Sequence, residues 1–362
     1  MFRYIFIVIF FYILVSCNNS SVIFYNTTKN EMIDIPETFG ETSIKEHSYH
    51  NGEGRIAFDG IVSVIPYNAF RCDSSIVYIK LPQTISIIGD LSFFCCTALK
   101  SITIPHNCKV IGASAFAGCG NLREIKLPNG LEKIEAAAFS GCSSLESISI
   151  PDSILNIEGS TFADCQHLSS VHFSESVKDI GNYAFFNCQS LKNVCLPFSL
   201  SSIGESAFAG CKSITELSIP DSVVVITDHS FFNCNQLQNI KLPKMLREID
   251  SYAFAGCSNL SHIDISSNVK EIGEGTFFEC ADLTSITLPK GLSYIGKAAL
   301  GNCFNLKTVY CFAENVPTCE YDVFEGTPIE NATLYVPEAS IEDYKASETW
   351  SKFKEIQPCV LP

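Results

Sequence analysis

Apolar and polar positions follow a unit of 23 residues that recurs about ten times along this chain, as in residues 119–141, CGNLREIKLPNGLEKIEAAAFSG. Phenylalanine recurs with this period from Phe70 to Phe277, and Leu300 takes the next position. Cysteine recurs with the same period from Cys96 to Cys303. Because neither series slips, no unit in that span has gained or lost a residue. Repetition with a period of this length predicts a solenoid of stacked coils.

The first half of each unit predicts a short strand with one buried face. Ile125 and Leu127 flank Lys126 in an apolar–polar alternation, and Pro128 follows directly. Alternation with period two is typical of a half-buried strand, and proline ends a strand because it lacks the N–H donor. The equivalent strands of successive coils should therefore pair in parallel.

The second half of each unit predicts a turn, a second strand and a helical turn. Leu131 and Ile134 are three residues apart, which favours a turn and a very short strand near Ile134. Ala138 and Phe139 are expected to point inward from a helical turn. Each coil then buries about seven apolar side chains, worth roughly 10–20 kcal/mol, while ordering the coil costs at least as much. One coil alone cannot fold, so stacking must supply the balance.

The chain before the repeats predicts an exported protein with a lipid anchor. Residues 1–16, MFRYIFIVIFFYILVS, are too short an apolar run to span a bilayer and are typical of a signal peptide. Leu14 to Cys17 resembles the bacterial lipobox, which implies cleavage before Cys17 and acylation of that cysteine. Residues 17–51 are predicted to form a tether and an N-terminal cap, with short strands at 22–25 and 32–35.

The repeats are predicted over residues 52–326, with Ile56 and Phe58 in the strand positions of the first coil. Cys72 comes one residue before the cysteine register, so the first coil is expected to be irregular. Residues 327–362 are predicted to form a C-terminal cap, with a strand at 333–336 and an amphipathic helix at 339–353. Trp350, the one tryptophan, is expected to plug the open end of the core.

The cysteine content is explained by the repeat rather than by a disulfide framework. Ten of the eighteen cysteines occupy one position of the unit. Equivalent Cβ atoms in stacked strands lie about 4.8 Å apart, beyond the usual ~3.5–4.5 Å of a disulfide. These residues are therefore predicted to be buried free thiols. The pairing of Cys311, Cys319 and Cys359 is left open.

Composition and motifs exclude several classes of function. A net charge of −15 argues against a nucleic-acid partner, which needs a basic surface. No hydrolase, zinc-protease, nucleotide-binding or dinucleotide-binding motif occurs, so neither an enzyme nor a cofactor is predicted. The His47–His50 pair is interpreted as part of a polar loop. Cys195 is predicted to be an exposed thiol without a catalytic role.

The candidate binding surface consists of the outward positions of the first strands. Small hydroxyl residues dominate these positions, charge is mixed and aromatic residues are few, so a glycan ligand is not favoured and a face without any ligand is the plain alternative. The candidates are Tyr78, Lys80, Glu124, Lys126, His172, Asn193, Glu216, Asn239, Lys241, His262, Asp264 and Tyr310.

The unit C-x-x-L-x-x-I-x-I-P-x-x-V-x-x-I-G-x-x-A-F resembles the BspA-type, or Treponema-type, leucine-rich repeat over residues 52–326. The flanking segments GEGRIAFDG and ATLYVPEASIEDYKASETW resemble those of gut Bacteroidetes members. The resemblance implies a right-handed superhelix with a concave parallel sheet, short second strands and helical turns on the convex side. It also implies adhesion to host or bacterial surfaces.

These observations favour a monomeric, lipid-anchored leucine-rich-repeat protein of the cell envelope that binds a host or bacterial surface protein through its concave sheet. The location would be the outer membrane, on its surface or periplasmic side. A structural spacer without a ligand is one alternative, and an enzyme or enzyme inhibitor built on the scaffold is another.

Overall fold

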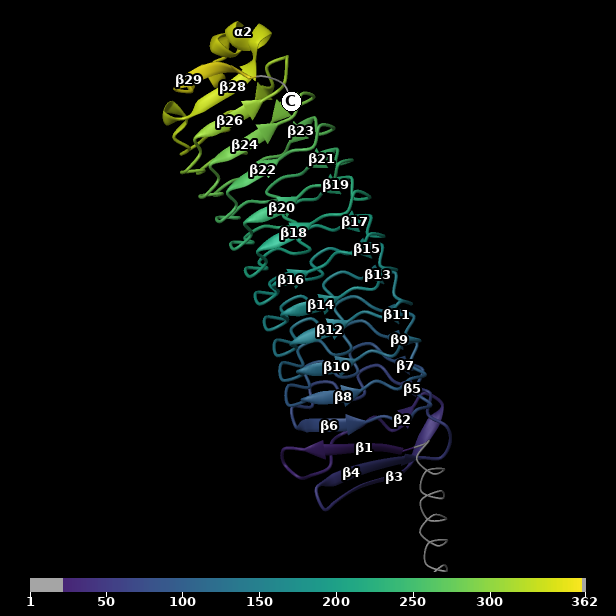
Figure 1. Cartoon of the computed structure of the whole chain (residues 1–362). Helices are drawn as coiled ribbons and strands as arrows, with labels where there is room; N and C mark the ends of the chain where they lie inside the picture. The colour runs from purple at the N-terminus through teal and green to yellow at the C-terminus, as the bar shows by residue number, and fades with distance from the viewer. Residues whose placement is uncertain (1–21, 360–362) are drawn as a thin grey trace, which may run out of the picture. The chain divides into compact units, whose positions relative to one another are not determined.

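The structure is a computed structural model that describes residues 22–359. The predicted signal peptide at 1–16 and the predicted lipidation site Cys17 lie outside these residues. The described chain divides into unit 1, up to residue 154, and unit 2, from residue 155. Within each unit the coils stack as successive rungs, with first strands in one row and second strands in another (Figure 1). The hand and concavity of the superhelix stay predictions.

In unit 1 the paired strands of the repeats are parallel and keep the repeat register. Ile125 pairs with Ile102, and Ile134 pairs with Ile111, so equivalent apolar residues lie side by side. The first strands are β6 (Ile76–Lys80), β8 (Ser101–Thr103), β10 (Glu124–Lys126) and β12 (Ser147–Ser149). The second strands are β5 (Val64–Ile65), β7 (Ile87–Ile88), β9 (Val110–Ile111) and β11 (Lys133–Ile134).

Unit 2 repeats this arrangement. Its first strands are β14 (Ser170–His172), β16 (Asn193–Val194), β18 (Glu216–Ser218), β20 (Asn239–Lys241), β22 (His262–Asp264), β24 (Ser285–Leu288) and β26 (Thr308–Cys311). Its second strands are β13 (Asn156–Ile157), β15 (Asp179–Ile180), β17 (Ser202–Ile203), β19 (Val225–Ile226), β21 (Glu248–Ile249), β23 (Glu271–Ile272), β25 (Tyr294–Ile295) and β27 (Thr318–Cys319). The predicted parallel solenoid is thus confirmed.

The predicted helical turns are wrong. Glu135 and Cys142 are linked by successive turns, each closed by a hydrogen bond between residues three apart. Ala137 and Gly141 have φ values of 56° and 71°, which lie outside the range of a right-handed helix. This backbone turns alternate N–H groups toward the next coil, where they donate across distances of 2.7–3.0 Å, as from Ser114 to Ala136, Phe116 to Ala138 and Gly118 to Ser140.

The phenylalanine ladder, Phe70 to Phe277 at the repeat interval, forms the centre of the core. In unit 1 the rings of Phe70, Phe93 and Phe116 stack with centroids 5.0 and 5.1 Å apart. In unit 2 the centroid separations from Phe162 to Phe277 are 5.3–5.7 Å. These rings are almost completely buried, as predicted.

The thiol ladder, Cys96 to Cys303 at the repeat interval, is buried and hydrogen-bonded. The Cys119 thiol donates to the carbonyl of Phe93 in the preceding coil over 3.1 Å, and the Cys211 thiol donates to Phe185 over 3.2 Å. All seventeen cysteines in the described chain are free. These thiols therefore link neighbouring coils, in addition to filling space as the sequence predicted.

The N-terminal cap places a strand between two segments that the sequence predicts to be neighbours, the strand with Ile56 and Phe58 and the first strand of the next coil. β1 (Val22–Thr27) lies between β6 and β4 (Glu53–Phe58) and is antiparallel to both. The expected strand at 32–35 is absent. The expected polar loop around His47 and His50 is instead β3 (Thr42–His50), which pairs with β4 and with β2 (Thr38–Phe39). The ring of Phe39 lies 5.9 Å from Phe70 and covers the end of the phenylalanine ladder.

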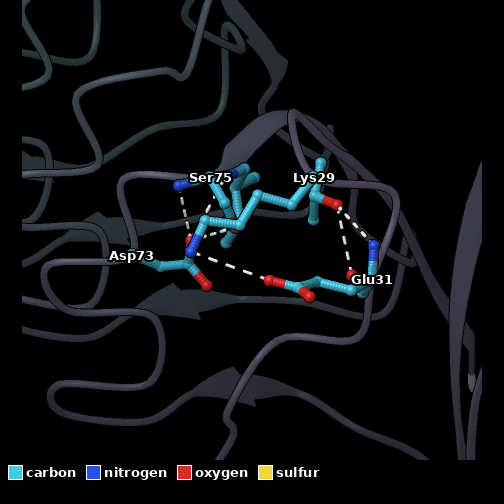
Figure 2. A network of polar contacts seen from close by, with 6 residues as sticks. Lys29, Glu31, Asp73 and Ser75 are labelled. Carbon is cyan, nitrogen blue, oxygen red and sulfur yellow. Dashed lines mark hydrogen bonds and ion pairs between the residues drawn. The ribbon is translucent and has the colours of Figure 1, made fainter.

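Polar contacts hold the first coil against this cap (Figure 2). Asp73 Oδ1 accepts hydrogen bonds from the backbone N–H and the hydroxyl of Ser75, over 2.7 and 2.6 Å. The Ser75 carbonyl accepts the N–H of Thr28 over 2.8 Å. Asp73 occupies the ladder position of the first coil, since Cys72 lies one residue before the cysteine register. The first coil therefore has a carboxylate where later coils have a buried thiol.

The C-terminal cap uses less helix than the sequence predicts. The predicted helix at 339–353 is reduced to α2 (Ile341–Ala346), with short 3-10 turns at η3 (Glu338–Ser340) and η4 (Trp350–Lys352), because Ser347 is extended. The predicted strand is β28 (Thr333–Pro337), and β29 (Glu355–Cys359) adds a further parallel strand. Trp350 is completely buried beside Phe324. Within residues 22–359, no helix has the length and apolar composition needed to cross a bilayer.

We expect Phe185→Ala to lower the free energy of unfolding by roughly 3–5 kcal/mol, because the cavity cannot be filled by rings stacked on both sides. Denaturant unfolding measures this loss. The matched control is Phe198→Ala, which removes a ring that is 86% exposed and should change stability by less than ~0.5 kcal/mol. Equal losses of unfolding free energy in the two variants would contradict the prediction that the buried Phe185 ring stabilises the fold.

Ladder thiols should react with an alkylating reagent only after denaturation, whereas Cys72 and Cys195 are exposed and should react in the folded protein. Burial raises the pKa of Cys119 and of Cys234 to about 12, so almost no thiolate forms at neutral pH. Mass spectrometry of the alkylated peptides gives the result. Disulfides between ladder cysteines would contradict the prediction.

Candidate functional site

The predicted surface residues of unit 1 lie on the outward face of the first strands. Lys80, Glu124 and Lys126 are exposed, and Tyr78 is half-buried. Glu124 and Lys126 form an ion pair, with Oε1 and Nζ 3.4 Å apart. Because this pair is highly exposed, it adds little to stability and leaves the face polar and mixed in charge.

The predicted surface residues of unit 2 are all exposed, but only some are brought together. Glu216, Asn239 and Lys241 line one hollow of about 550 Å³ over β16, β18 and β20. Within the described chain, neither Glu216 nor Lys241 has an ion-pair partner. Their side chains therefore present one free negative and one free positive charge on adjacent strands.

The floor of this hollow is apolar. Val194, Leu196, Leu217, Ile240 and Pro220 line it beneath the charged residues. β16 has only two residues, and β18 pairs with β20 but not with β16. The first-strand sheet of unit 2 is thus interrupted between β16 and β18, within the hollow, as it also is between β20 and β22. In the floor, Val194 and Leu217 are buried, whereas Leu196, Pro220 and Ile240 are half-buried.

Phe198 forms a wall of the hollow that the sequence interpretation missed. Its side chain is 86% exposed, and its backbone N–H donates to Glu175 Oε2 over 3.0 Å. Nine other coils place a polar residue at this position of the unit, namely Gln83, His106, Asn129, Asp152, Glu175, Asp221, Lys244, Ser267 and Lys290, and the two end coils have the small residues Gly60 and Ala313. Comparison of equivalent positions could therefore have found it.

Cys195 is the second departure from the repeat in this coil. It lies in the hollow, is exposed, and occupies an outward position that holds Lys126, His172, Ser218 or Lys241 in other coils. The sequence placed it correctly at the surface. Cys195 and Phe198 belong to the same coil, residues 188–210.

The remaining predicted residues lie apart from the hollow. His262 and Asp264 pair with each other, with Nε2 and Oδ2 3.1 Å apart. Tyr310 stacks on Tyr335 of β28 with centroids 5.0 Å apart, a neighbour that the prediction omitted. His172 and Asn193 are exposed on β14 and β16 but do not line the hollow.

A second hollow of about 810 Å³ lies over β21, β23 and β25, on the second strands. Asp228, Glu248, Asp250 and Glu271 line it beside Arg247 and Lys270. Burial raises the pKa of Asp250, and the nearby charges of Asp228 and Glu248 raise it further. Within residues 22–359, no group of three His, Cys, Asp or Glu side chains is arranged to hold a metal ion.

The first hollow presents charged, polar and aromatic groups on one face. Its groups are one free carboxylate, one free ammonium, an amide, the hydroxyl of Ser218, a thiol and an exposed ring. No described group of the hollow acts as a base on Cys195, since no hydrogen bond joins that thiol to a histidine or carboxylate. Activated nucleophiles require such a partner.

Comparisons with known proteins agree with this architecture. Residues 18–145, 109–236 and 201–330 match the family described as BspA type leucine rich repeat region in six copies. The chain belongs to the BspA-type leucine-rich repeat family. No curated protein matches it.

Solved structures of other repeat proteins are similar to this BspA-type chain. A leucine-rich repeat protein from Bacteroides ovatus is 28% identical, with a TM-score of 0.61, and the alignment covers 91% of this chain and 93% of that one. A leucine rich cell surface protein from Faecalibacterium prausnitzii is 23% identical, with a TM-score of 0.52 and coverage of 87% and 86%. The second likeness supports the fold alone.

Proposed function

We propose that this BspA-type chain is a cell-envelope protein that binds a protein partner through the hollow over β16, β18 and β20. The observation that carries the proposal is Phe198, an exposed ring at a position that is polar or small in the other coils. An exposed aromatic costs solubility and contributes nothing to the core. Its presence beside an apolar floor is explained if a partner covers it.

The chemistry of the hollow favours a protein surface as the occupant. Energetically important residues at protein interfaces are aromatic side chains that bury in a partner, surrounded by polar groups. Phe198 would be such an anchor, and Glu216 and Lys241 would orient the partner through opposite charges. One ring without a parallel second ring offers little to a sugar.

We further propose that the chain is anchored in the membrane through lipid on Cys17. The support is the lipobox-like Leu14–Cys17 behind an apolar run. The relative from Faecalibacterium prausnitzii is described as a cell surface protein, which is consistent with exposure of this chain outside the cell. Adhesion to a host or bacterial surface protein is the role that fits both proposals.

We expect Phe198→Ala to weaken binding of a protein ligand at least tenfold without loss of folding. The probe is a phage-displayed peptide library selected on the purified chain, and the affinity of selected peptides is then measured by surface plasmon resonance. Lys241→Glu should also weaken binding, because it reverses the one free positive charge of the hollow.

The matched control for this measurement is Phe304→Ala, which removes another exposed ring of unit 2, 58% accessible to solvent, outside the hollow. It should leave the affinity unchanged. Peptides whose affinity survives both Phe198→Ala and Lys241→Glu would refute the hollow as the binding site. A library that yields no binder would favour a structural spacer.

We expect Cys17→Ser to move the protein from the membrane fraction to the soluble fraction, because acylation requires the thiol. Cell fractionation with immunoblotting measures the shift, and Cys195→Ser is the control. Protease treatment of intact cells distinguishes the surface from the periplasmic side. Retention of Cys17→Ser in the membrane would contradict the lipid anchor.

A further inference from the structure

Two cysteines of unit 1 lie at the same position of adjacent coils and near the surface. Cys72 is exposed and Cys95 is half-buried. The backbone N–H of Cys72 donates to the carbonyl of Phe94 over 2.7 Å, so Cys72 faces the peptide bond that begins Cys95. Both residues have left-handed backbones, with φ of 60° and 55°. The two side chains therefore leave similar backbones in the same direction.

These thiols differ from the thiol ladder in their contacts. Ladder thiols donate to phenylalanine carbonyls, as Cys96 does to Phe70 over 3.0 Å. The Cys95 thiol donates to no such carbonyl among the described hydrogen bonds, and the Cys72 thiol is a neighbour of it. Burial raises the pKa of Cys95, the charge and hydrogen bonding of Cys72 raise it further, and Arg71 lowers it. A neighbouring surface thiol thus distinguishes Cys95 from the ladder thiols.

The spacing of the coils allows a bond between these two sulfurs. Equivalent Cα atoms in stacked strands are about 4.8 Å apart, which lies within the ~4.4–6.8 Å range of disulfides. Equivalent Cβ atoms need to approach by about 0.3 Å to reach the usual range. The first coil is a terminal repeat, which contacts the cap on one side instead of another identical coil. Closing the bond requires this coil to move by that amount.

The present orientation of Cys95 also leaves room for rotation. Its Sγ lies 2.9 Å from the point that a Cβ of Gly118 would occupy, in the next coil. Since Gly118 has no side chain, the thiol is not wedged between two side chains. Rotation about the Cα–Cβ bond of Cys95 brings the sulfur from the Gly118 side toward Cys72.

A small oxidant has access to Cys72 through a hollow of about 570 Å³. Lys29 and Arg71 line this hollow together with the carboxylates of Glu31, Asp34 and Asp73. Lys29 is paired with Glu31 over 3.6 Å, so the hollow is mixed in charge. Oxidised glutathione carries both carboxylate and ammonium groups, so it suits such a hollow.

We propose that Cys72 and Cys95 are an oxidisable pair, which a low-molecular-weight disulfide such as oxidised glutathione converts into a disulfide between the first and second coils. The thiolate of Cys72 attacks one sulfur of the oxidant and releases one glutathione thiolate, which takes up the proton. The thiolate of Cys95 then attacks the Cys72 sulfur of the mixed disulfide and releases the second glutathione. Two protein thiols are oxidised and one small disulfide is reduced.

The closed loop covers one whole coil. A disulfide between equivalent residues one period apart restricts the unfolded chain over about two dozen residues, which stabilises the folded state. The first coil is the one that meets the cap, so the bond would secure the end of the repeat array against fraying.

The test treats the full chain with oxidised glutathione, with reduced glutathione as the parallel control. After alkylation of the remaining thiols, unreduced peptides are mapped by mass spectrometry. We expect a cross-link between Cys72 and Cys95, two fewer free thiols, and a denaturation midpoint that rises and returns when dithiothreitol is added. Unreacted thiols at both positions would overturn the proposal, as would a mixed disulfide on Cys72 that does not close.

Matched variants separate this pair from the other exposed thiol. Cys72→Ser and Cys95→Ser should each abolish both the cross-link and the rise in the midpoint. Cys195→Ser, at an exposed thiol in unit 2, should leave both unchanged. A cross-link from Cys95 to the adjacent ladder thiol Cys96 would also overturn the proposal. If one variant folds poorly, the presence or absence of the Cys72–Cys95 cross-link in the unmodified chain still decides whether the disulfide forms.

Discussion

Each coil of this protein can bury its apolar side chains only against another coil. Phe185 is fully buried because Phe162 and Phe208 lie 5.4 and 5.3 Å from it, on the two sides. The same holds for the thiol of Cys211, which finds its acceptor in the preceding coil and not in its own. Contacts between equivalent residues thus carry the stability, and a period without insertions is their necessary condition.

This dependence on neighbours explains the two ends of the array. An end coil lacks one neighbour, so another kind of structure must cover the open face. In unit 1 the ring of Phe39 serves this purpose, and β1 occupies the place of the next parallel strand. In unit 2 Trp350 and Phe324 close the core. The sequence predicted the tryptophan plug, because a lone tryptophan follows the last repeat.

The sequence predicted most of the coil but not its turns. Ile125, Leu127 and Phe139 are recognisable from alternation and period alone, since burial selects apolar residues. The left-handed backbone at Ala137 has no such signature, because the residues at that position differ from coil to coil and include Tyr183 and Tyr252. The left-handed conformation at this position is imposed by hydrogen bonds to the next coil, and the local sequence carries no signal for it. A helical turn was therefore a reasonable prediction and a wrong one.

The candidate site was predicted in part for a related reason. Outward strand positions follow from alternation, so Glu216, Asn239 and Lys241 were identified. Phe198 and the gap between β16 and β18 were not identified, because the prediction used the residues that all coils have in common. In a repeat protein the shared residues serve stacking, which every coil needs equally. A residue that differs from those at the equivalent position of other coils is therefore not explained by stacking, and its role is sought in contacts outside the array. Phe198 differs from the equivalent residues at the surface of unit 2. Cys72 and Cys95 differ from them near the N-terminal end of the array. These coils can therefore make contacts with a partner, or thiol–disulfide exchange with an oxidant, that the other coils cannot.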